Sequence, residues 1–295
     1  MLDMTTTQSL GLFGKSLVGN NYSQNSIRAY TDDVRQFIEW VKGNRIDWDK
    51  PVSFSRVDII GFLNFLADKK ATGVTRVRKL AAIRKFFTFL RDNAVIAGNP
   101  AETIKGPIRE ERDPEVLYRN EYKALLYEAQ GNIRDYAILM LFLQTGLRVG
   151  ELVNLKLDDI DIENKMLIVR QGKGKKDRTI PLEEQSLGAL NIYLDDKKGQ
   201  NGIVDFQTLF LAKNGTSMDV RTVRWMVHKY VQKAGIRKKA SVHTLRHTFG
   251  THKVDKGMTL PALQELLGHK KMETTYKYVH LAKTSLRQQQ EQTSL

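Results

Sequence analysis

The sequence contains no cysteine, which excludes both disulfide bonds and cysteine-ligated metal sites. It also lacks a long apolar run, because the longest one, residues 137–143, is far too short to span a bilayer and predicts a buried helix. The first fifteen residues do not place an apolar stretch after a basic start, so we expect no secretory signal. These absences favour a cytoplasmic protein that engages no membrane.

Acidic residues are scarce relative to basic ones. The 295 residues include 47 lysines and arginines against 33 aspartates and glutamates, giving a formal net charge of +14 and a pI near 9.7. Such an excess favours a polyanionic partner, above all nucleic acid. A basic surface of no special function, or a ribosome-associated protein, would have the same composition. The length allows two domains with a core each.

The first half, residues 20 to 104, shows apolar residues at helical spacing. Ser55 and Asp58 have the spacing of a capping box that opens a helix. Another helix is expected over residues 75 to 91, and one of its faces carries cations with no acidic residue among them. We predict that this face contacts DNA phosphates, with coincidental basicity as the alternative. The predicted contact residues are Arg76, Arg78, Lys79, Arg84 and Lys85.

A break in the apolar pattern divides the chain. The stretch KGPIREERDPEV, residues 105–116, has two prolines, mixed charges and no periodicity, which is typical of a linker. The predicted organisation is a helical DNA-binding domain over residues 1–108, a linker at 109–116, and a catalytic domain with a polar tail over 117–295.

The second half is predicted to be helical around one small antiparallel sheet. Asn120 is expected to cap a helix, and the patterns at 219–234 and 259–268 predict two more. Short β-type runs at 166–169 and 179–182 flank a turn rich in glycine and lysine, which predicts a hairpin. The expected fold class is therefore mainly α, with a mixed α/β second domain.

Three segments of the second half carry side chains suited to phosphoryl chemistry. Arg148 follows a Thr-Gly turn at a helix start, where its guanidinium and nearby backbone N–H groups can meet a phosphate. His243 and Arg246 stand three residues apart on a helix, so they face the same way and can share one phosphate. Lys173 lies in the glycine-rich turn, which can approach a DNA backbone closely.

A fourth segment places His269 after Leu-Gly, followed by Tyr276 and Tyr278. A histidine just after a glycine helix stop lies on a rigid corner. Residues two apart on a helix differ by about 200° in direction, so only one tyrosine can point at the arginines. Taken singly, all four features also occur without function, as surface arginines, ordinary turns, capped helix starts and packed tyrosines.

In this order, the four segments resemble the signature of the tyrosine recombinase (phage integrase) family. That signature is an arginine within TG-x-R-xx-E-L, a hairpin lysine, HxxR, LGH, and a tyrosine nine residues beyond the LGH histidine, which selects Tyr278 over Tyr276. The first half also resembles the family's helical core-binding domain. The matching residues are Arg148, Glu151, Lys173, His243, Arg246, His269 and Tyr278.

The resemblance implies a DNA strand transferase that uses neither a metal nor another cofactor. Tyr278 would attack phosphorus to give a 3′-phosphotyrosyl link, and Lys173 would protonate the leaving 5′-oxygen. The other implied roles are phosphate binding by Arg148, Arg246 and His269, proton transfer by His243, and orientation of these groups by Glu151. Lys175, Lys176 and Arg178, beside the hairpin turn, are expected to contact DNA.

Several functions share these features. The resemblance implies duplex DNA with specific recombination sites as partner, bound by a tetrameric synaptic complex. Because the helical pattern begins within the first twenty or so residues, we expect no additional arm-binding domain, and this expectation favours a Xer-type or transposon-encoded resolvase. A mobile-element integrase, a type IB topoisomerase and a non-catalytic DNA-binding relative are the alternatives.

Overall fold

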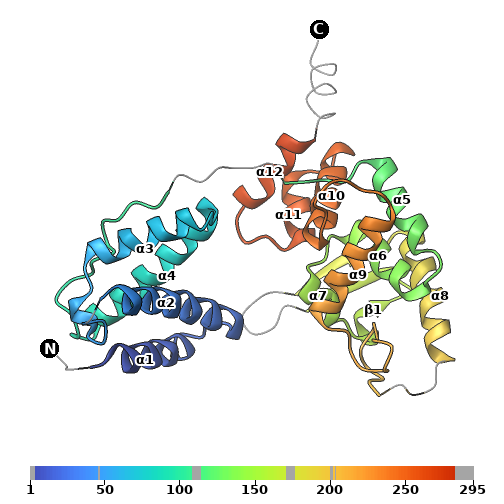
Figure 1. Cartoon of the computed structure of the whole chain (residues 1–295). Helices are drawn as coiled ribbons and strands as arrows, with labels where there is room; N and C mark the ends of the chain where they lie inside the picture. The colour runs from blue at the N-terminus through green and yellow to red at the C-terminus, as the bar shows by residue number, and fades with distance from the viewer. Residues whose placement is uncertain are drawn as a thin grey trace, which may run out of the picture. The chain divides into compact units, whose positions relative to one another are not determined.

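A computed structural model shows two compact units, Met1–Arg112 and Asp113–Leu295 (Figure 1). It describes residues 4–45, 47–107, 114–170, 177–199, 202 and 204–282. Both units are mainly helical and a small antiparallel sheet lies in the second, which confirms the predicted fold class. None of the described helices is long and apolar enough to cross a membrane. Most of the predicted linker, residues 109–113, and the tail after residue 282 lie outside the described residues.

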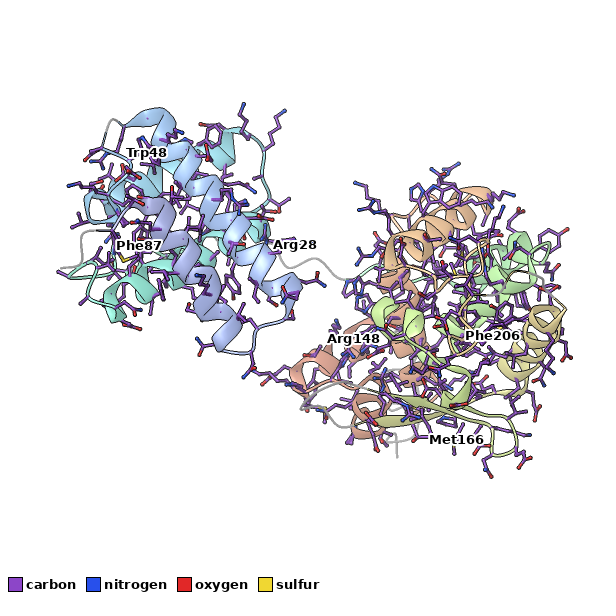
Figure 2. The ribbon with its side chains drawn as sticks, turned by 90° about the horizontal axis from the view of Figure 1, so that it is seen from below. Arg28, Trp48, Phe87, Arg148, Met166 and Phe206 are labelled. Atoms are coloured by element: carbon purple, nitrogen blue, oxygen red, sulfur yellow. The ribbon has the colours of Figure 1, made fainter. Side chains whose placement is uncertain are left out.

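The helices of the first unit enclose an aromatic core, in which Phe87 is one of the labelled residues of Figure 2. The ring of Phe37 meets the rings of Phe62 and Phe87 edge-on, with centroids 5.5 and 6.1 Å away. This geometry adds to the stabilisation that burial of aromatic rings provides. The helices are α1 (Thr6–Gly19), α2 (Gln24–Asn44), α3 (Arg56–Asp68) and α4 (Gly73–Asp92), with a 3-10 turn η1 (Pro51–Ser53).

Capping residues define where these helices begin. The backbone N–H of Ser55 donates to Asp58 at 2.7 Å, so the predicted capping box opens α3. Thr72 caps α4, which includes the whole predicted stretch 75–91. The helix α1 precedes the predicted helical region, and a capping box of Thr5 and Gln8 starts it.

The second unit is built around α6, whose residues 137–142 are all buried, as the apolar run predicts. Helices α5, α8 and α10 pack against it. A separate small core, which includes Phe249 and Leu267, joins α10, α11 and α12. The helices are α5 (Arg119–Ala129), α6 (Ile133–Thr145), α7 (Val149–Val153), α8 (Glu184–Lys198), α9 (Val220–Lys233), α10 (Val242–Asp255), α11 (Leu260–Leu267) and α12 (Glu273–Leu281), with a 3-10 turn η2 (Leu157–Asp159).

The sheet contains the predicted hairpin and a further short strand. Among the described residues its order is β1 (Ile160–Asp161), β2 (Met166–Val169) and β3 (Arg178–Pro181), all antiparallel. The pair Leu167 and Ile180 is buried, so this face packs on the core. The turn that joins β2 to β3, residues 171–176, lies outside the described residues.

The prediction that Asn120 caps α5 is wrong. The cap is Tyr118, whose backbone N–H donates to the Glu121 carboxylate at 2.7 Å. Because Glu121 already satisfies this N–H, the helix begins one residue before Asn120.

Candidate active site

Arg148 and Glu151 are held together at the start of α7. Gly146 ends α6 in the left-handed conformation, with φ of 62°, and the chain turns so that Arg148 becomes the N-cap of α7. The Glu151 carboxylate accepts the Arg148 backbone N–H and one guanidinium N–H, each at 2.7 Å. The Arg148 side chain remains 39% exposed, so its guanidinium can still take an external ligand.

Arg178 contacts the other side of the same carboxylate. Its two terminal nitrogens donate to Glu151 at 3.0 and 2.8 Å, and its Nε donates to the carbonyl of Leu266 at 2.7 Å. The side chain is 5% exposed, so the predicted contact of Arg178 with DNA would require the side chain to leave these partners. Burial alone would raise the pKa of Glu151, but the hydrogen bonds and charges of Arg178 and Arg148 lower it to about 2. Glu151 therefore stays ionised and fixes both arginines.

Arg246 is buried between the ends of two helices. It donates to the carbonyl of Gly146, which ends α6, at 2.5 Å, and to the carbonyl of Leu267, the last residue of α11, at 2.6 Å. Carbonyls at helix C-termini lack helical partners and carry partial negative charge, which suits a buried cation. Burial and the charge of Arg148 lower the pKa of Arg246 to about 10, so it is still charged at neutral pH.

The two predicted phosphate-binding arginines converge on one turn. Arg148 donates to the carbonyl of Gly268 at 3.1 Å, and Arg246 binds the preceding carbonyl, that of Leu267. Gly268 has φ of 61°, so glycine suits this position and lets α11 stop there. The chain thus brings together two guanidinium groups that are ninety-eight residues apart in the sequence.

Two of the histidines lie close to these arginines and are neutral at pH 7. The Nδ1 atom of His269 is 3.0 Å from the hydroxyl of Thr275, and burial and Arg246 lower the pKa of His269 to about 3. His243 lies in the first turn of α10, where partial desolvation by its neighbours and the charge of Arg246 lower its pKa as well. A neutral imidazole can donate one proton and accept another, as proton transfer requires.

Tyr278 lies on α12 with its ring fully buried. Its ring stacks on His269, with centroids 6.2 Å apart and planes at 6°. Burial raises the pKa of the Tyr278 hydroxyl, and the charges of Arg246 and Arg148 oppose this rise. Tyr276, by contrast, is 55% exposed. The structure therefore places Tyr278 and not Tyr276 beside the arginines.

The sequence interpretation missed two groups that contact Tyr278. The Nδ1 atom of His247 is 3.3 Å from the Tyr278 hydroxyl, and burial and Lys277 lower the pKa of His247 to about 4. The ammonium of Lys277 lies 5.4 Å from the centre of the Tyr278 ring. The sequence carried a signal for His247, because it follows His243 by four residues and so shares its helix face.

Gly250 provides the space that the Tyr278 ring occupies. A Cβ atom at position 250 would lie 2.7 Å from Cε1 and 2.8 Å from Cζ of that ring. We expect Gly250→Ala to displace Tyr278, to destabilise the protein by about 1–3 kcal/mol and to slow any reaction of the hydroxyl. The matched control is Gly150→Ala on α7, where an added Cβ meets nothing within 4 Å. Thermal unfolding of both variants checks this, and equal stability of the two would contradict the assigned packing.

The predicted DNA-contacting residues of α4 differ in their surroundings. Lys79 is buried and donates to Asp33 at 2.9 Å and to Gln36 at 2.7 Å, so its predicted contact with phosphate would require these bonds to break. Arg78 also pairs with Asp33, but its side chain is 52% exposed. The other three, Arg76, Arg84 and Lys85, are partly exposed. Arg84 donates to the carbonyls of Ala101 and Ile104, and the ammonium of Lys85 lies over the ring of Tyr22. Lys173, Lys175 and Lys176 lie outside the described residues.

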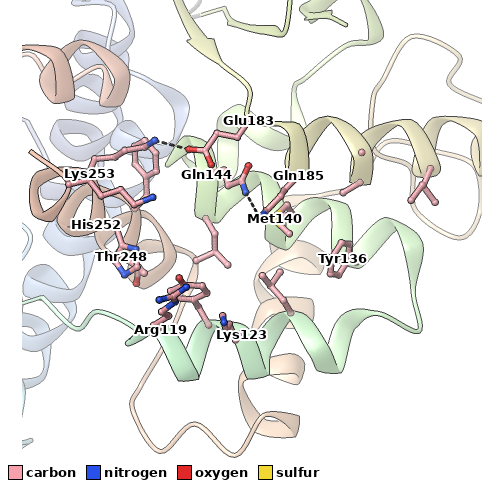
Figure 3. Close-up of a pocket in the computed structure, with 18 residues that line it drawn as sticks. Arg119, Lys123, Tyr136, Met140, Gln144, Glu183, Gln185, Thr248, His252 and Lys253 are labelled. Carbon is pink, nitrogen blue, oxygen red and sulfur yellow. Dashed lines mark hydrogen bonds and ion pairs between the residues drawn. The ribbon is translucent and has the colours of Figure 1, made fainter. Parts of the chain in front are cut away.

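A hollow elsewhere in the second unit includes none of the predicted catalytic residues. It has a volume of about 670 Å³ and lies among α5, α6, α8 and α10 (Figure 3). At its edge, Lys253 donates to Glu183 at 2.8 Å. In the described part of the chain, no cluster of three His, Asp or Glu side chains could hold a metal ion. The arginine and tyrosine cluster is therefore the candidate active site.

Comparison with known proteins identifies the family of the chain. The profile of the phage integrase family matches residues 115–285, and that of the phage integrase N-terminal SAM-like domain matches residues 13–93. The tyrosine recombinase XerC of Caldanaerobacter subterraneus subsp. tengcongensis is 36% identical over 288 residues, covering 90% of this chain and 80% of that protein. The chain belongs to the phage integrase family of tyrosine recombinases. Another member, XerD of Listeria innocua, is 33% identical over 92% of this chain and 93% of that protein.

Solved structures of a recombinase and of a transposon integrase share the fold. The XerA recombinase is 32% identical with a TM-score of 0.58, and the match covers 98% of this chain and 99% of that one. The Tn1549 transposon integrase in complex with a circular intermediate DNA has a TM-score of 0.78 over 99% of this chain and 100% of that one. Its sequence identity is 22%, so this second likeness bears on the fold alone.

Proposed function

We propose that this tyrosine recombinase cuts and rejoins duplex DNA at specific sites through a 3′-phosphotyrosyl intermediate. The convergence of Arg148 and Arg246 on the turn that ends α11, with the Tyr278 hydroxyl in the field of both charges, carries the proposal. Two fixed guanidinium groups can bind the non-bridging oxygens of one phosphate and stabilise the charge that develops during attack.

In the proposed reaction the Tyr278 oxygen bonds to phosphorus while the bond from phosphorus to the 5′-oxygen breaks. The phenolic proton passes to a neutral imidazole: His247 is nearest in the structure, and His243 assists in its transfer. Lys173 gives a proton to the leaving 5′-oxygen, and His269 donates a third hydrogen bond to the phosphate. One phosphoester replaces another, so the rejoining step needs no external energy source.

The buried Tyr278 side chain indicates a resting state. A hydroxyl with no exposure cannot touch a phosphate, and its raised pKa disfavours the nucleophilic phenolate. We propose that DNA binding moves α12 enough to expose Tyr278, and that the phosphate then replaces the carbonyl contact of Arg148 with Gly268 and those of Arg246 with Gly146 and Leu267. Glu151 keeps that arginine oriented throughout, because it binds both the backbone and the side chain of residue 148.

The partners proposed for the chain are duplex recombination sites and further copies of itself. A net charge of +14 favours a polyanion. Exchange between two duplexes needs four cleavages, and each copy offers one nucleophile, so we propose a tetrameric synaptic complex. Its proposed biological role is the resolution of DNA dimers or transposon cointegrates.

A covalent adduct tests the proposed function. The preferred duplex is first selected from a random-sequence library by binding to the full chain, and is then nicked close to the cleavage point so that cut strands cannot rejoin. We expect a protein–DNA adduct that resists denaturation and is linked to Tyr278. No adduct on the selected duplex would refute the reaction. Relaxation of any supercoiled circle without exchange between two selected sites would instead indicate topoisomerase activity.

The proposed role of Lys173 yields a prediction of chemical rescue. We expect Lys173→Ala to bind DNA like the wild type but to form adduct about 10²–10⁴-fold more slowly, as loss of a general acid implies. A duplex with sulfur in place of the bridging 5′-oxygen has a leaving group that needs no proton, so it should restore the rate. Quench-flow measurement of adduct formation on both duplexes checks this. If sulfur gives the variant no greater gain than the wild type, Lys173 is not the acid.

A further inference from the structure

A small basic hollow lies in the first unit, between α3 and the segment that follows α4. It has a volume of about 430 Å³, and three cations line it: Arg56 at the start of α3, Arg76 in the first turns of α4, and Lys105 beyond α4. The side chains of Arg56 and Lys105 are exposed, and neither residue lies on the α4 face that the charge pattern singles out. None of the described residues that line the hollow is acidic.

The Nε atom of Arg76 is buried and has no hydrogen-bond partner among the described residues. A buried donor of this kind is rare in folded proteins, because it loses its bond to water without gaining another. The guanidinium of the neighbouring Arg56 is held in position because it donates to the hydroxyl of Thr103 at 2.9 Å. The hollow therefore holds the hydrogen-bonded guanidinium of Arg56, the unpaired Nε donor of Arg76 and the exposed ammonium of Lys105.

These groups define the chemistry of the missing acceptor. It must be anionic, because three cations and no carboxylate surround it, and it must present several oxygens to donors on three separate segments. Ile60 and Leu63 add an apolar wall, which suits the carbon atoms of a sugar. A phosphodiester joined to deoxyribose satisfies all three conditions.

We propose that this hollow binds a backbone phosphate of duplex DNA and anchors the first unit on the duplex. The inference rests on duplex DNA being the ligand of the protein, and it adds Arg56 and Lys105 to the DNA contacts. Because the contact is to phosphate, it sets affinity and register and does not read the base sequence.

The salt dependence of DNA binding tests whether the hollow binds a phosphate. The full-length variants Arg56→Gln, Arg76→Gln and Lys105→Gln are titrated with a random-sequence duplex at several salt concentrations, beside the charge-matched control Lys15→Gln. Lys15 is exposed on α1, which does not line the hollow. We expect each hollow variant to bind about tenfold more weakly and each to lose up to about 0.9 from the slope of log affinity against log salt. The control and the charge-keeping Arg76→Lys are expected to retain most of the wild-type slope. The proposal would be overturned if the salt slopes of all three hollow variants equalled the slope of Lys15→Gln.

A direct signal separates phosphate binding from a change in folding. In protein labelled with ¹⁵N-arginine, the Nε–H resonance of Arg76, assigned through Arg76→Gln, should shift when the duplex saturates the protein. An unmoved resonance would overturn the proposal even if affinity falls. If the wild type forms no adduct, the strand-transfer reaction is refuted. The salt slopes and the Arg76 resonance would still show whether the hollow binds a DNA phosphate.

Discussion

Replacing Tyr278 by phenylalanine is expected to abolish adduct formation, with a loss of about 10⁵-fold or more, while DNA affinity stays at the wild-type level. Only the hydroxyl is lost, and the ring keeps its packing on Gly250 and His269. The loss of one hydrogen bond to His247 should change the free energy of unfolding by no more than about 1 kcal/mol. Binding titrations, denaturing gels and thermal unfolding measure the three quantities.

The matched control is Tyr276→Phe, which makes the same chemical change two residues away. Because Tyr276 is 55% exposed, this variant should keep its stability and its adduct. Peptide mapping of the wild-type adduct identifies the modified residue. An adduct on Tyr276, or an active Tyr278→Phe variant, would refute the assignment of the nucleophile.

The local motifs were predictable because short-range chemistry fixes them. The Ser55 cap, the buried run of α6 and the glycine stop at 268 each depend on residues within a few positions of one another. The cap of α5 also depends on residues close in sequence. There, however, both Asn120 and Glu121 could have capped the helix, and the structure shows Glu121 bound to the backbone N–H of Tyr118. The third strand, β1, is two residues long and gives no periodic pattern.

Long-range pairing could not be predicted for two of the residues expected to contact DNA. A pattern of positive charge shows where cations stand but not which of them find a carboxylate when the chain folds. Lys79 meets Asp33, 46 residues earlier, and Arg178 meets Glu151, 27 residues earlier. The link of His247 to Tyr278 spans 31 residues and was missed for the same reason.

Replacing Glu151 by glutamine is expected to harm both stability and catalysis. The carboxylate joins Arg148, which must face the phosphate, to the buried Arg178, so the neutral variant leaves a buried cation without its counter-charge. We expect a loss of about 3 kcal/mol in the free energy of unfolding at pH 7. Cleavage of bound DNA should slow by about 10²-fold, because the guanidinium of Arg148 loses its fixed position.

The pH dependence of the stability loss in Glu151→Gln shows whether Glu151 stabilises the fold through its negative charge or through its packing. The folded protein lowers the pKa of Glu151 from 4.5 to about 2, so the unfolded chain takes up a proton first as the pH falls. Stabilisation by the carboxylate is therefore complete above about pH 4.5 and is lost as the pH falls toward 2. The stability difference between the wild type and Glu151→Gln should shrink through this window.

Glu121→Gln is the control for that comparison. It makes the same change in the same unit, at a carboxylate that pairs with the partly exposed Lys238, so it should cost no more than about 1 kcal/mol. Guanidinium-induced unfolding at a series of pH values, with the transitions of the two units fitted separately, gives both differences. A deficit in Glu151→Gln that stays constant from pH 7 to pH 2 would mean that the carboxylate acts through packing, and that its charge does not hold the two arginines in place.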